Sequence, residues 1–590
     1  MQTMSITDNS TPSNFYASVL LQAQRHPNAI AAVDGTRDIT YAQFVVDIER
    51  VTRRLHSLAL LPGGRVAIHV QHTYLHWLVA IGLWRAGMLS VSVNNLGEPG
   101  LLALLKANVA ITEQEVLSFE GGRFVRIGAE WLNSEADSLP PFQEQAFDAG
   151  HPVRMILSSG TTGTSKAILL THRIIETRIN NTVSEYRFDS SSRFMSIVGI
   201  DTVGGFVFSL AIWSAGGAVA FFKPNLPVDR NIAESKSNLL FMSPMQLSHL
   251  VDILPADHSA DPRMEVLVAG AILPRAIAMK AHQRLTGAIT VVYGSTEAGT
   301  VALTREPLEY ENPGVCGHVV PGTELQVVNG AGQPVCSGFP GEIRMRGPCC
   351  VTAYLDDEAT SGVMFRDGWF YPGDTGVLSE TGLLSISGRV GDVINLGGVK
   401  IAPALIEEVL FACPGVKDVA AFSLEAQDGA VGLWLAVVRG DGYLQDTLIS
   451  RYQHQFKQSA PNFVHIDMIP RNGMGKVLRN VLRDAVRARL ASQPSLPDGN
   501  GAEDPRNALE GEVSRHRGLA ASIVKIDNKD YDYGTLPDEA KSQLASLRFV
   551  DAELQRLNAQ AAVLQTARMA HAKALSEALG AMGGESVKFQ

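Results

Sequence analysis

The first 380 or so residues alternate short β-branched runs with stretches whose apolar residues recur at helical spacing. Residues 65–70 predict a strand, residues 74–87 a helix that ends at a glycine, and residues 89–94 a second strand. A strand, helix and strand of these lengths form a βαβ unit. Strand patterns of the same kind, with helical patterns around them, recur at residues 265–269 and 289–293. We therefore expect an α/β domain whose parallel sheets are covered by helices.

One apolar segment, residues 194–222, imitates a transmembrane span because Asp201 is its only charged side chain. Four glycines and several hydroxyl residues interrupt it, whereas a span needs about 20 predominantly apolar residues. We expect a buried strand, a loop and a buried helix instead, and no transmembrane span. The polar N-terminus lacks a basic region followed by an apolar stretch, so no secretory signal is predicted and a cytoplasmic location is expected.

The pattern of predicted elements changes after Pro313. Residues 314–389 consist of short extended pieces separated by glycine turns, which predicts an antiparallel or β-barrel-like subdomain at the end of a large domain, residues 1–389. A small α+β domain is expected at residues 390–490. Its predicted elements are a helix at residues 404–411, strands at residues 419–422 and 433–438, and a further helix.

The last hundred residues predict a separate tail. Residues 491–506 are rich in Pro, Ser, Asp and Gly and read as a linker. Within residues 507–590, turn residues 527–530 predict a hairpin, and a long helical pattern runs from Pro537 to about Leu579. We expect a coiled coil that oligomerises or docks on a partner; a helix folded back on the main body is the alternative. The seam residues are Leu547, Val550, Leu554, Leu557, Ala561 and Leu564.

Composition narrows the class of protein. The 590 residues suffice for two to four domains, and 50 basic against 60 acidic side chains give a net charge of −10, which disfavours nucleic acid as a partner. The five cysteines are never spaced C-x-x-C. A zinc site or a disulfide framework is therefore not expected, and a reducing compartment is.

The most informative stretch is residues 155–172, MILSSGTTGTSKAILLTH. An apolar strand enters a loop of glycine and hydroxyl residues that ends in a lysine, and such a loop suits a polyphosphate because backbone N–H groups, hydroxyls and a cation can approach the anion together. The spacing is not that of a Walker A loop. The string closely resembles the signature loop of the adenylate-forming superfamily, which includes acyl-CoA synthetases, luciferases and peptide-synthetase adenylation domains. The matching positions are Ser159, Gly160, Thr161, Thr162, Gly163 and Lys166, and Ala167 replaces the usual glycine.

Further motifs follow in the order of that superfamily. Residues 291–299, VVYGSTEAG, resemble the segment that places Tyr293 against adenine and Thr296 on the nucleotide, and Glu297 matches the family's magnesium ligand. A carboxylate oxygen suits a hard dication that neutralises phosphate charge. The resemblance adds Gly270, Ala271, Gly294 and Ser295 to the ATP site.

Three later motifs complete the resemblance. Asp374 matches the aspartate that accepts hydrogen bonds from the ribose hydroxyls, and Arg389 the arginine that pairs with ribose and phosphate. The resemblance implies that Gly391 is the hinge about which the small, mobile domain rotates, and that the large domain has several layers. Lys476 matches the mobile lysine that bridges the attacking carboxylate and the α-phosphate, which makes it a catalytic candidate. The resemblance also implies catalytic roles for Thr162 and Glu297, an ATP contact for Lys400, and a thiol tunnel lined by Gly397 and Gly398.

The resemblance implies that Mg·ATP and a carboxylic acid form an acyl-adenylate, and that a thiol, most readily that of CoA, then takes the acyl group. The acid itself stays open, whether fatty, aromatic or amino acid. Asp201 and Gly204, with Gly270, mark the expected acyl pocket, and Asp201 either binds a substrate amine or bonds to its own loop. The alternatives are an amino-acid-adenylating enzyme that loads a separate carrier protein, and a nucleotide-binding scaffold without turnover.

Overall fold

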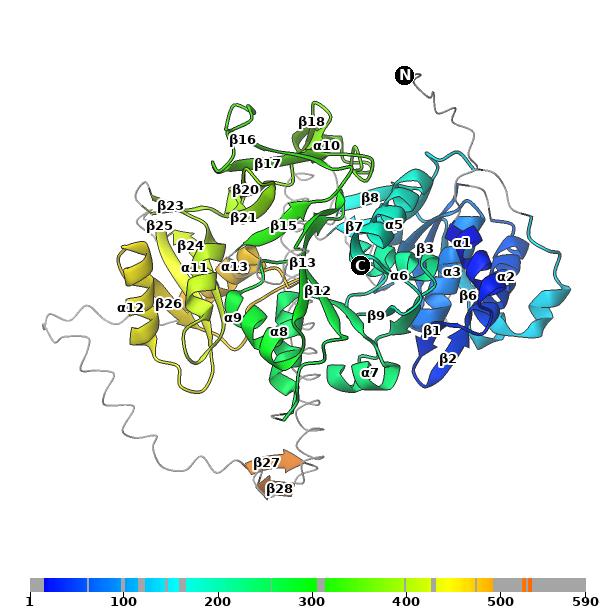
Figure 1. The fold of residues 1–590 in the computed structure, drawn as a ribbon, viewed down its shortest axis with the longest axis horizontal. Coiled ribbons are helices and arrows are strands. Elements are labelled where there is room, and N and C mark those ends of the chain that lie inside the picture. Colours follow the sequence, from blue (N-terminus) through cyan, green and yellow to red (C-terminus); the bar gives the residue numbers. More distant parts are fainter. Residues whose placement is uncertain are drawn as a thin grey trace, which may run out of the picture. The chain divides into compact units, whose positions relative to one another are not determined.

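The computed structural model describes residues 15–60, 63–96, 101–114, 122–143, 147–158, 166–255, 257–304, 314–396, 399–425, 431–472, 475–491, 523–526 and 529–532. These residues fall into two compact units, one within residues 1–493 and the other within residues 494–590. The expected linker beyond Ala491 and the expected long helix lie outside the described residues. All of the site described below therefore belongs to the first unit (Figure 1).

A six-stranded sheet forms the N-terminal part of this unit, with the order β6-β5-β3-β4-β7-β8. The expected βαβ unit is confirmed: β3 (Arg65–His69) and β4 (Leu89–Ser92) are parallel and α3 (Thr73–Arg85) connects them. The helix stops where Gly87 adopts a φ of +67°, a conformation that glycine accepts without strain. The remaining strands are β5 (Val109–Thr112), β6 (Arg123–Arg126), β7 (Pro152–Ser158) and β8 (Lys166–Thr171), and only β8 is antiparallel to its neighbour.

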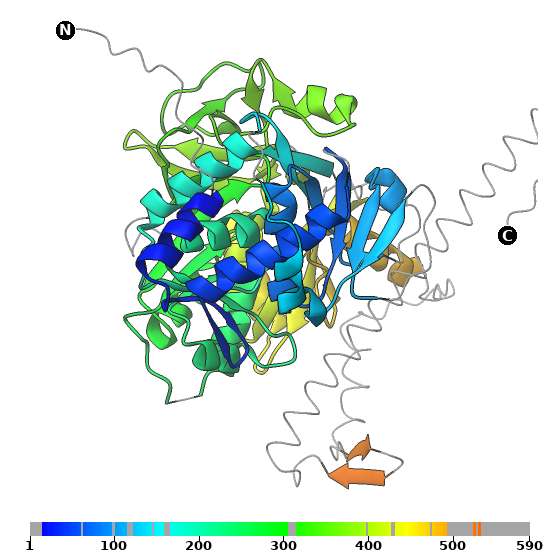
Figure 2. The same ribbon diagram turned by 90° about the vertical axis from the view of Figure 1, so that its right-hand side faces the viewer.

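A second, 15-stranded sheet contains the parallel strands that the β-branched runs predict. β12 (Glu265–Ala269) has the predicted bounds, and residues 194–222 form a strand, a loop and a buried helix as expected. The N-terminal helices are dark blue in Figure 2. Of these, α1 packs on α2, and it also packs on α6. The elements are α1 (Phe15–Arg25), β1 (Ile30–Asp34), β2 (Arg37–Thr40), α2 (Tyr41–Ser57), α4 (Leu101–Leu104), α5 (His172–Tyr186), β9 (Arg193–Ser196), α6 (Val203–Ser214), β10 (Ala218–Phe221), α7 (Val228–Ser235), β11 (Leu239–Met242), α8 (Pro244–Ile253), α9 (Arg275–Arg284) and β13 (Ala288–Ser295).

The strands of residues 314–389 are antiparallel, as expected, but they do not form a separate barrel-like sheet. They extend the large sheet, because β14 (Gly299–Leu303) pairs with β13 on one side and β15 (Val315–Val319) on the other. The sequence could not show this, since pairing partners lie far apart along the chain. The further elements are β16 (Glu324–Val328), β17 (Gly341–Arg346), α10 (Glu358–Met364), β18 (Phe365–Arg366), β19 (Trp369–Phe370), β20 (Asp374–Leu378) and β21 (Leu383–Arg389).

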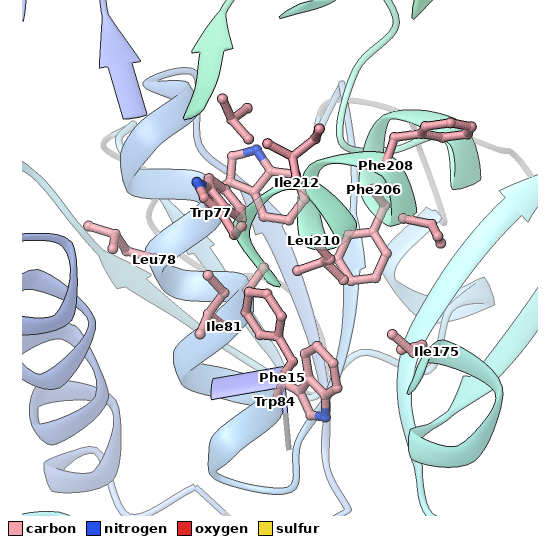
Figure 3. Packing of buried hydrophobic residues seen from close by; sticks show 14 of the residues in the cluster. Phe15, Trp77, Leu78, Ile81, Trp84, Ile175, Phe206, Phe208, Leu210 and Ile212 are labelled. Carbon is pink, nitrogen blue, oxygen red and sulfur yellow. The ribbon is translucent and has the colours of Figure 1, made fainter. Parts of the chain in front are cut away.

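An aromatic core fixes the helices that later line the site (Figure 3). Phe15 of α1 stacks on Trp84 of α3 with ring centroids 5.6 Å apart, and Trp77 stacks on Phe206 of α6 at 5.5 Å. Such pairs add about 0.5–1.5 kcal/mol each to the free energy of area burial. The same core contains Phe208, which also lines a cavity of about 570 Å³. The core therefore holds α5 and α6 in fixed positions beside that cavity.

The segment after Arg389 carries its own three-stranded sheet, β24-β25-β26. Its helix and strands at residues 404–411, 419–422 and 433–438 are confirmed, each slightly longer than expected. α11 and α12 share one hydrophobic cluster of this segment and α13 belongs to another (Figure 1, yellow). The elements are η4 (Val390–Asp392), β22 (Ile394–Leu396), β23 (Val399–Ile401), α11 (Pro403–Phe411), β24 (Val416–Glu425), β25 (Val431–Arg439), α12 (Gln445–Phe456), β26 (Asn462–His465) and α13 (Arg479–Ala491).

In the second unit the predicted hairpin is present as the antiparallel pair β27 (Ile523–Ile526) and β28 (Lys529–Asp532). Its second strand begins two residues earlier than the sequence suggests. Among the helices of the described residues, none combines the length and the apolarity needed to cross a membrane.

Candidate active site

Two adjoining cavities lie where the carboxyl ends of the parallel strands meet the segment after Arg389. The larger has a volume of about 570 Å³ and the smaller about 240 Å³. Gly270, Gly294, Arg389 and Lys476 line both cavities, so these residues mark the junction. Crevices at the carboxyl ends of parallel strands are the usual ligand sites of α/β folds.

The smaller cavity contains a hydrogen-bonded group suited to a nucleoside. Tyr293 at the end of β13 donates its hydroxyl hydrogen to Oδ2 of Asp374, at 2.8 Å. Asp374 begins β20 and lies directly opposite Arg389 of β21, whose Nε is 3.1 Å from Oδ1. The carboxylate of Asp374 thus contacts both the phenol of Tyr293 and the guanidinium of Arg389. Ala271 lines this cavity as well, as the sequence predicted.

Lys476 lies at the junction of the two cavities. Burial, and after it the charge of Arg389, lower the pKa of its ammonium group to about 8, while the charges of Asp374 and Asp392 oppose this shift. A lysine of this kind is still cationic at neutral pH but holds its proton far less tightly than a surface lysine does. A desolvated cation in a cavity is suited to stabilise developing negative charge.

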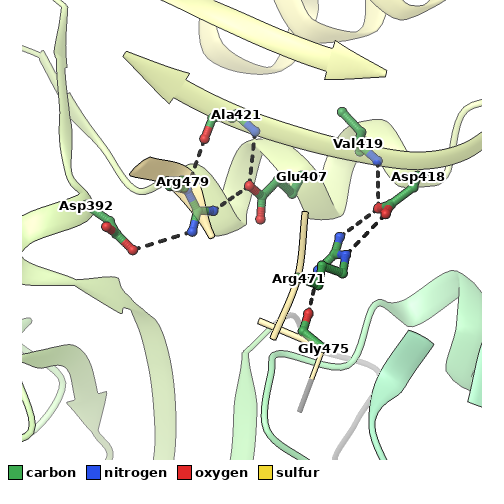
Figure 4. Close-up of polar contacts among 8 residues, drawn as sticks. All are labelled: Asp392, Glu407, Asp418, Val419, Ala421, Arg471, Gly475 and Arg479. Carbon is green, nitrogen blue, oxygen red and sulfur yellow. Dashed lines mark hydrogen bonds and ion pairs between the residues drawn. The ribbon is translucent and has the colours of Figure 1, made fainter. Parts of the chain in front are cut away.

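The turn that carries Lys476 is held by contacts within its own segment (Figure 4). Arg471 Nη2 lies 2.7 Å from Oδ1 of Asp418, and Nη1 of the same arginine donates to the carbonyl of Gly475. Asn472 accepts the backbone N–H of Lys476 on its side-chain oxygen at 2.9 Å. These contacts hold the described ends of the turn, and Lys476 lines both cavities.

A second arginine, Arg479, fixes the base of the same turn. It contacts Glu407 of α11, donates through Nε to the carbonyl of Ala421 at 3.1 Å, and lies 3.4 Å from Oδ2 of Asp392 (Figure 4). Asp392 follows Gly391 directly. The residue next to the expected hinge is thereby joined to the lysine-bearing segment.

The expected phosphate loop connects two neighbouring strands. β7 and β8 are antiparallel, with Ser158 opposite Lys166, so both ends of the loop are held side by side. Leu157 and Lys166 line the larger cavity, which places these ends at the site. Five predicted loop residues lie outside the described residues: Ser159, Gly160, Thr161, Thr162 and Gly163.

Glu297, the expected magnesium ligand, has a phenolic partner that sequence reasoning missed. Tyr354 donates its hydroxyl hydrogen to Oε1 of Glu297 at 2.8 Å, and Lys166 Nζ lies 4.9 Å from the centroid of the Tyr354 ring. Burial and the adjacent carboxylate raise the pKa of Tyr354, so it remains a donor at neutral pH. Tyr354 therefore fixes one carboxylate oxygen while Glu297 lines the larger cavity.

Arg178 of α5 supports the loop on which Glu297 lies. Its fully buried guanidinium donates to the backbone carbonyls of Thr296 (3.1 Å), Glu297 (2.9 Å) and Cys349 (2.8 Å). Burial lowers the pKa of this guanidinium, and neighbouring acidic groups oppose the shift. Its partners are backbone carbonyls 118 to 171 residues away, so no side-chain pattern in the sequence signals them.

Asp201 and Gly204, which the sequence analysis expects in an acyl pocket, line the larger cavity. Asp201 Oδ2 accepts a hydrogen bond from Asn94 at 3.0 Å. The buried guanidinium of Arg154 donates to the carbonyl of Ile200, and burial lowers the pKa of Arg154 to about 10, an effect that the charge of Asp201 opposes. Asp201 thus has partners of its own. A Cβ at Gly204 would lie 2.4 Å from the ring of Phe241, so glycine keeps this wall open.

The remaining predicted residues are placed as follows. Ser295 and Thr296 line the larger cavity with Glu297. Gly391 lies in η4, is exposed, and has open space where a Cβ would lie. Lys400 lies in β23 opposite Asn395, but its side chain is outside the described part of the chain, as are Gly397 and Gly398.

Comparison with known proteins shows the family. A family model described as AMP-binding enzyme matches residues 20–355, which is more than half of the chain. The chain therefore belongs to the AMP-binding enzyme family, and the resemblance to the adenylate-forming superfamily is confirmed.

Two curated relatives and one solved structure illustrate the likeness. A 4-chlorobenzoate–CoA ligase of Arthrobacter sp is 26% identical over 514 residues, covering 82% of this chain and 97% of the relative. A fatty acid–[acyl-carrier-protein] ligase of Mycobacterium marinum is 25% identical over 526 residues, covering 80% and 98%. The crystal structure of ATP-bound MatB from Rhodopseudomonas palustris matches with a TM-score of 0.70 and 23% identity, covering 80% of this chain and 99% of that one. The last likeness establishes the fold.

Proposed function

We propose that this enzyme is an ATP-dependent acid–thiol ligase. It activates a carboxylic acid as its acyl-adenylate, releases pyrophosphate, and transfers the acyl group to the thiol of CoA. One observation carries the proposal: Lys476 lies at the junction of a cavity that contains Tyr293 and Asp374 and a larger cavity with an apolar wall. A reaction that joins a nucleotide to an organic acid needs its reacting atoms at such a junction.

In the first half-reaction, a carboxylate oxygen of the acid forms a bond to the α-phosphorus of ATP, and the bond to the pyrophosphate oxygen breaks. Lys476 and Arg389 supply fixed positive charge where the attacking carboxylate and the α-phosphate approach each other. Asp374 offers acceptor oxygens to the ribose hydroxyls, and Tyr293 offers a flat ring to the base. Tyr293 and Asp374 are already hydrogen-bonded to each other, so these side chains need little further ordering when the nucleotide binds.

A magnesium ion fits the residues around Glu297. Among the described residues, no cluster of three or more His, Cys, Asp or Glu side chains is positioned to hold a metal alone. A Mg²⁺ ion that arrives with ATP does not need such a cluster, because one or two carboxylates and the phosphate oxygens complete its coordination. Glu297 would supply that carboxylate, and the ion would neutralise phosphate charge.

The second half-reaction requires a thiol. The relative that acts on 4-chlorobenzoate is named as a CoA ligase, which supports CoA as the acceptor. The Mycobacterium marinum relative is named as an acyl-carrier-protein ligase, so a carrier-bound thiol is the second candidate. With either acceptor, the segment after Gly391 would rotate. Lys476 would then leave the junction, and the face of the segment that binds the thiol would take its place.

ATP–pyrophosphate exchange over a panel of fatty, aromatic and amino acids tests the first half-reaction. We expect exchange that requires the acid and Mg²⁺. Thioester formation with CoA, compared with formation on a phosphopantetheinylated carrier, then tests the acceptor. Absence of exchange with every acid would contradict the proposal and favour a nucleotide-binding scaffold. Exchange confined to α-amino acids would favour the amino-acid-adenylating alternative.

A further inference from the structure

Arg154 of β7 connects two sheets of the first unit. β7 belongs to the six-stranded sheet, and β9 belongs to the 15-stranded sheet. Nη2 of Arg154 donates to the carbonyl of Ile200 at 3.1 Å, across 46 residues of sequence. Ile200 lies in residues 197–202, which we call the β9–α6 loop. A buried side chain thus joins the strand that enters the expected phosphate loop to the β9–α6 loop.

Residues on both sides of Ile200 in the β9–α6 loop line the larger cavity. They are Ile197, Val198, Gly199, Asp201 and Thr202. Among the described residues that line the smaller cavity, where Tyr293 and Asp374 lie, none belongs to this loop. A displacement of the loop should therefore affect the acid rather than the nucleotide.

The guanidinium of Arg154 is itself held in place. Nη1 donates to Oγ of Ser90 at 3.3 Å, Nη2 donates to Oγ of Ser92 at 2.6 Å, and the ring centroid of Phe206 lies 4.9 Å from Cζ. Oγ of Ser92 is also 2.7 Å from Nε2 of His76, whose other ring nitrogen faces a backbone carbonyl at 3.0 Å and therefore carries the hydrogen. Burial, and after it the charge of Arg154, lower the pKa of His76 to about 3, so this ring is neutral and accepts from Ser92. The oxygen of Ser92 is thus available to accept from Arg154.

A second contact holds the β9–α6 loop from the same sheet. Asn94, which follows β4 by two residues, donates to Oδ2 of Asp201 at 3.0 Å. Oδ1 of Asp201 lies 2.2 Å from the position that a Cβ at Gly199 would take, so this carboxylate lies against the backbone of its own loop. β4 and β7 are neighbouring strands. Arg154 and Asn94 thus reach two consecutive residues of the loop from neighbouring parts of the six-stranded sheet.

Stability alone does not explain a buried arginine at this position. Burial lowers the pKa of Arg154 to about 10, and Nε has no hydrogen-bond partner among the described residues. Buried ions can often be replaced by apolar side chains of similar size without loss of stability. An arginine that is desolvated here therefore indicates a role beyond packing.

We propose that Arg154 is a positioning residue for the acid: by holding the carbonyl of Ile200, it fixes the part of the larger cavity that the β9–α6 loop lines. This inference rests on the proposed function and identifies a residue on which recognition of the acid depends. Ile156 and Leu157, which follow Arg154 on β7, line the same cavity. One strand thus lines the cavity directly and, through Arg154, sets the position of a second lining segment.

Arg154→Met in the full-length protein tests this inference, because methionine has a similar length but cannot donate to Ile200. ATP–pyrophosphate exchange would be measured with benzoic, phenylacetic, hexanoic and dodecanoic acids and with phenylalanine. The acid with the highest wild-type kcat/KM would serve as the reference acid. We expect the KM of the reference acid to rise by at least about tenfold and the KM of ATP to change by less than about twofold, since a displacement of about 1 Å can cost about 10²-fold.

Arg85→Met provides the matched control. Arg85 is also buried, and its Nη2 lies 2.9 Å from Oε1 of Glu49 on α2. The midpoint of urea unfolding should fall in Arg85→Met because Glu49 loses a cationic partner, whereas both KM values should stay within about twofold of wild type. A similar rise of the acid KM in Arg85→Met would attribute the effect to lost stability and overturn the inference.

Two milder substitutions keep the test decisive if Arg154→Met does not fold. Arg154→Lys keeps a charge but loses the planar group that reaches three partners at once, so the acid KM should rise by less than in Arg154→Met. Asn94→Ala removes the second contact and should raise the acid KM by about threefold. An unchanged acid KM in both of these variants would overturn the inference.

The outcomes separate this inference from the ligase proposal. An unchanged acid KM in Arg154→Met, or equal rises of the two KM values, would overturn the positioning role and leave the ligase proposal intact. Absence of wild-type exchange with every acid tested would remove both.

Discussion

The hydroxyl of Tyr354 donates to Oε1 of Glu297 at 2.8 Å, and both residues line the cavity that Lys476 enters. The two are 57 residues apart in the chain. Tyr354 lies between β17 and α10, and the backbone N–H of Val351 in the same stretch donates to the carbonyl of Glu297. If Glu297 holds the magnesium ion of Mg·ATP, Tyr354 orients the ligand without touching the metal.

Replacing Tyr354 by Phe should therefore weaken the binding of Mg²⁺ rather than abolish chemistry. Partners that orient a metal ligand typically contribute about 10–100-fold to metal affinity. We expect the Mg²⁺ concentration for half-maximal pyrophosphate exchange to rise by about tenfold at fixed ATP. Tyr452→Phe is the control, since that buried hydroxyl has no hydrogen-bond partner. An unchanged Mg²⁺ requirement in Tyr354→Phe would show that the phenol does not orient the ligand.

Removal of the Lys476 ammonium should stop activation of the acid but not nucleotide binding. We expect Lys476→Ala to lower the exchange rate by about 10²–10³, the usual effect of losing one preorganised electrostatic contact. ATP affinity, measured by calorimetry, should change little. Lys417→Ala removes an exposed lysine of the same segment and should leave exchange unchanged. Wild-type exchange in Lys476→Ala would refute the catalytic role.

The pH dependence of adenylation follows from the pKa of Lys476. Because burial lowers this pKa to about 8, the free enzyme loses the lysine charge as pH rises above 8. The exchange kcat/KM, which reports groups of the free enzyme, should therefore fall through an apparent pKa near 8. In Lys476→Arg this alkaline limb should disappear, because a guanidinium stays protonated. A profile that is flat up to pH 10 in the wild-type enzyme would contradict the assignment.

Arg178 should contribute both to stability and to the nucleotide site. Its replacement by Met leaves several buried carbonyls without a donor, and we expect the free energy of unfolding to fall by about 3 kcal/mol. KM for ATP should rise, because the Glu297 loop loses its support. Arg173→Met, at an exposed position of the same helix, should change stability by less than about 0.5 kcal/mol. Equal effects of the two substitutions, measured by urea unfolding, would exclude a special role for Arg178.

Gly391 allows the two half-reactions to be separated. Proline fixes φ near −65°, which is compatible with the 3₁₀ turn of η4 but opposes a large change of backbone angle. Gly391→Pro should retain pyrophosphate exchange and lower thioester formation by at least about tenfold. Gly391→Ala, which has open space for its methyl group, should retain both. Equal loss of both reactions in Gly391→Pro would argue against a hinge at this position.

Much of the architecture could be predicted from hydrophobic pattern alone. Residues 265–269 are buried on both faces and predict β12 with its observed bounds, because a central parallel strand has no polar side. The continuation of the large sheet into the antiparallel strands was not predictable in this way. It depends on the pairing of β13 with β14 and of β14 with β15, and strand pairing leaves no local signal.

The residues of the candidate site likewise differ in whether the sequence could predict them. Tyr293, Asp374, Arg389 and Lys476 belong to recognisable strings, and the structure brings them together in the smaller cavity. Tyr354 belongs to no such string, because its place at the cavity depends on how the stretch between β17 and α10 folds. Asp201 is the conspicuous charge in an apolar segment, and the sequence left open whether it binds a substrate amine or bonds to its own loop. Its contact with Asn94 and its effect on Arg154 depend on the fold and could not be predicted.

The contacts that hold the Lys476 turn, from Arg471 to Asp418 and from Arg479 to Glu407, all lie on the C-terminal side of Gly391. If this segment rotates about Gly391 as proposed, the turn moves with it as one rigid body. The conformational entropy of arranging the lysine is then lost once, when the chain folds, and only the rotation remains to be organised in each catalytic cycle.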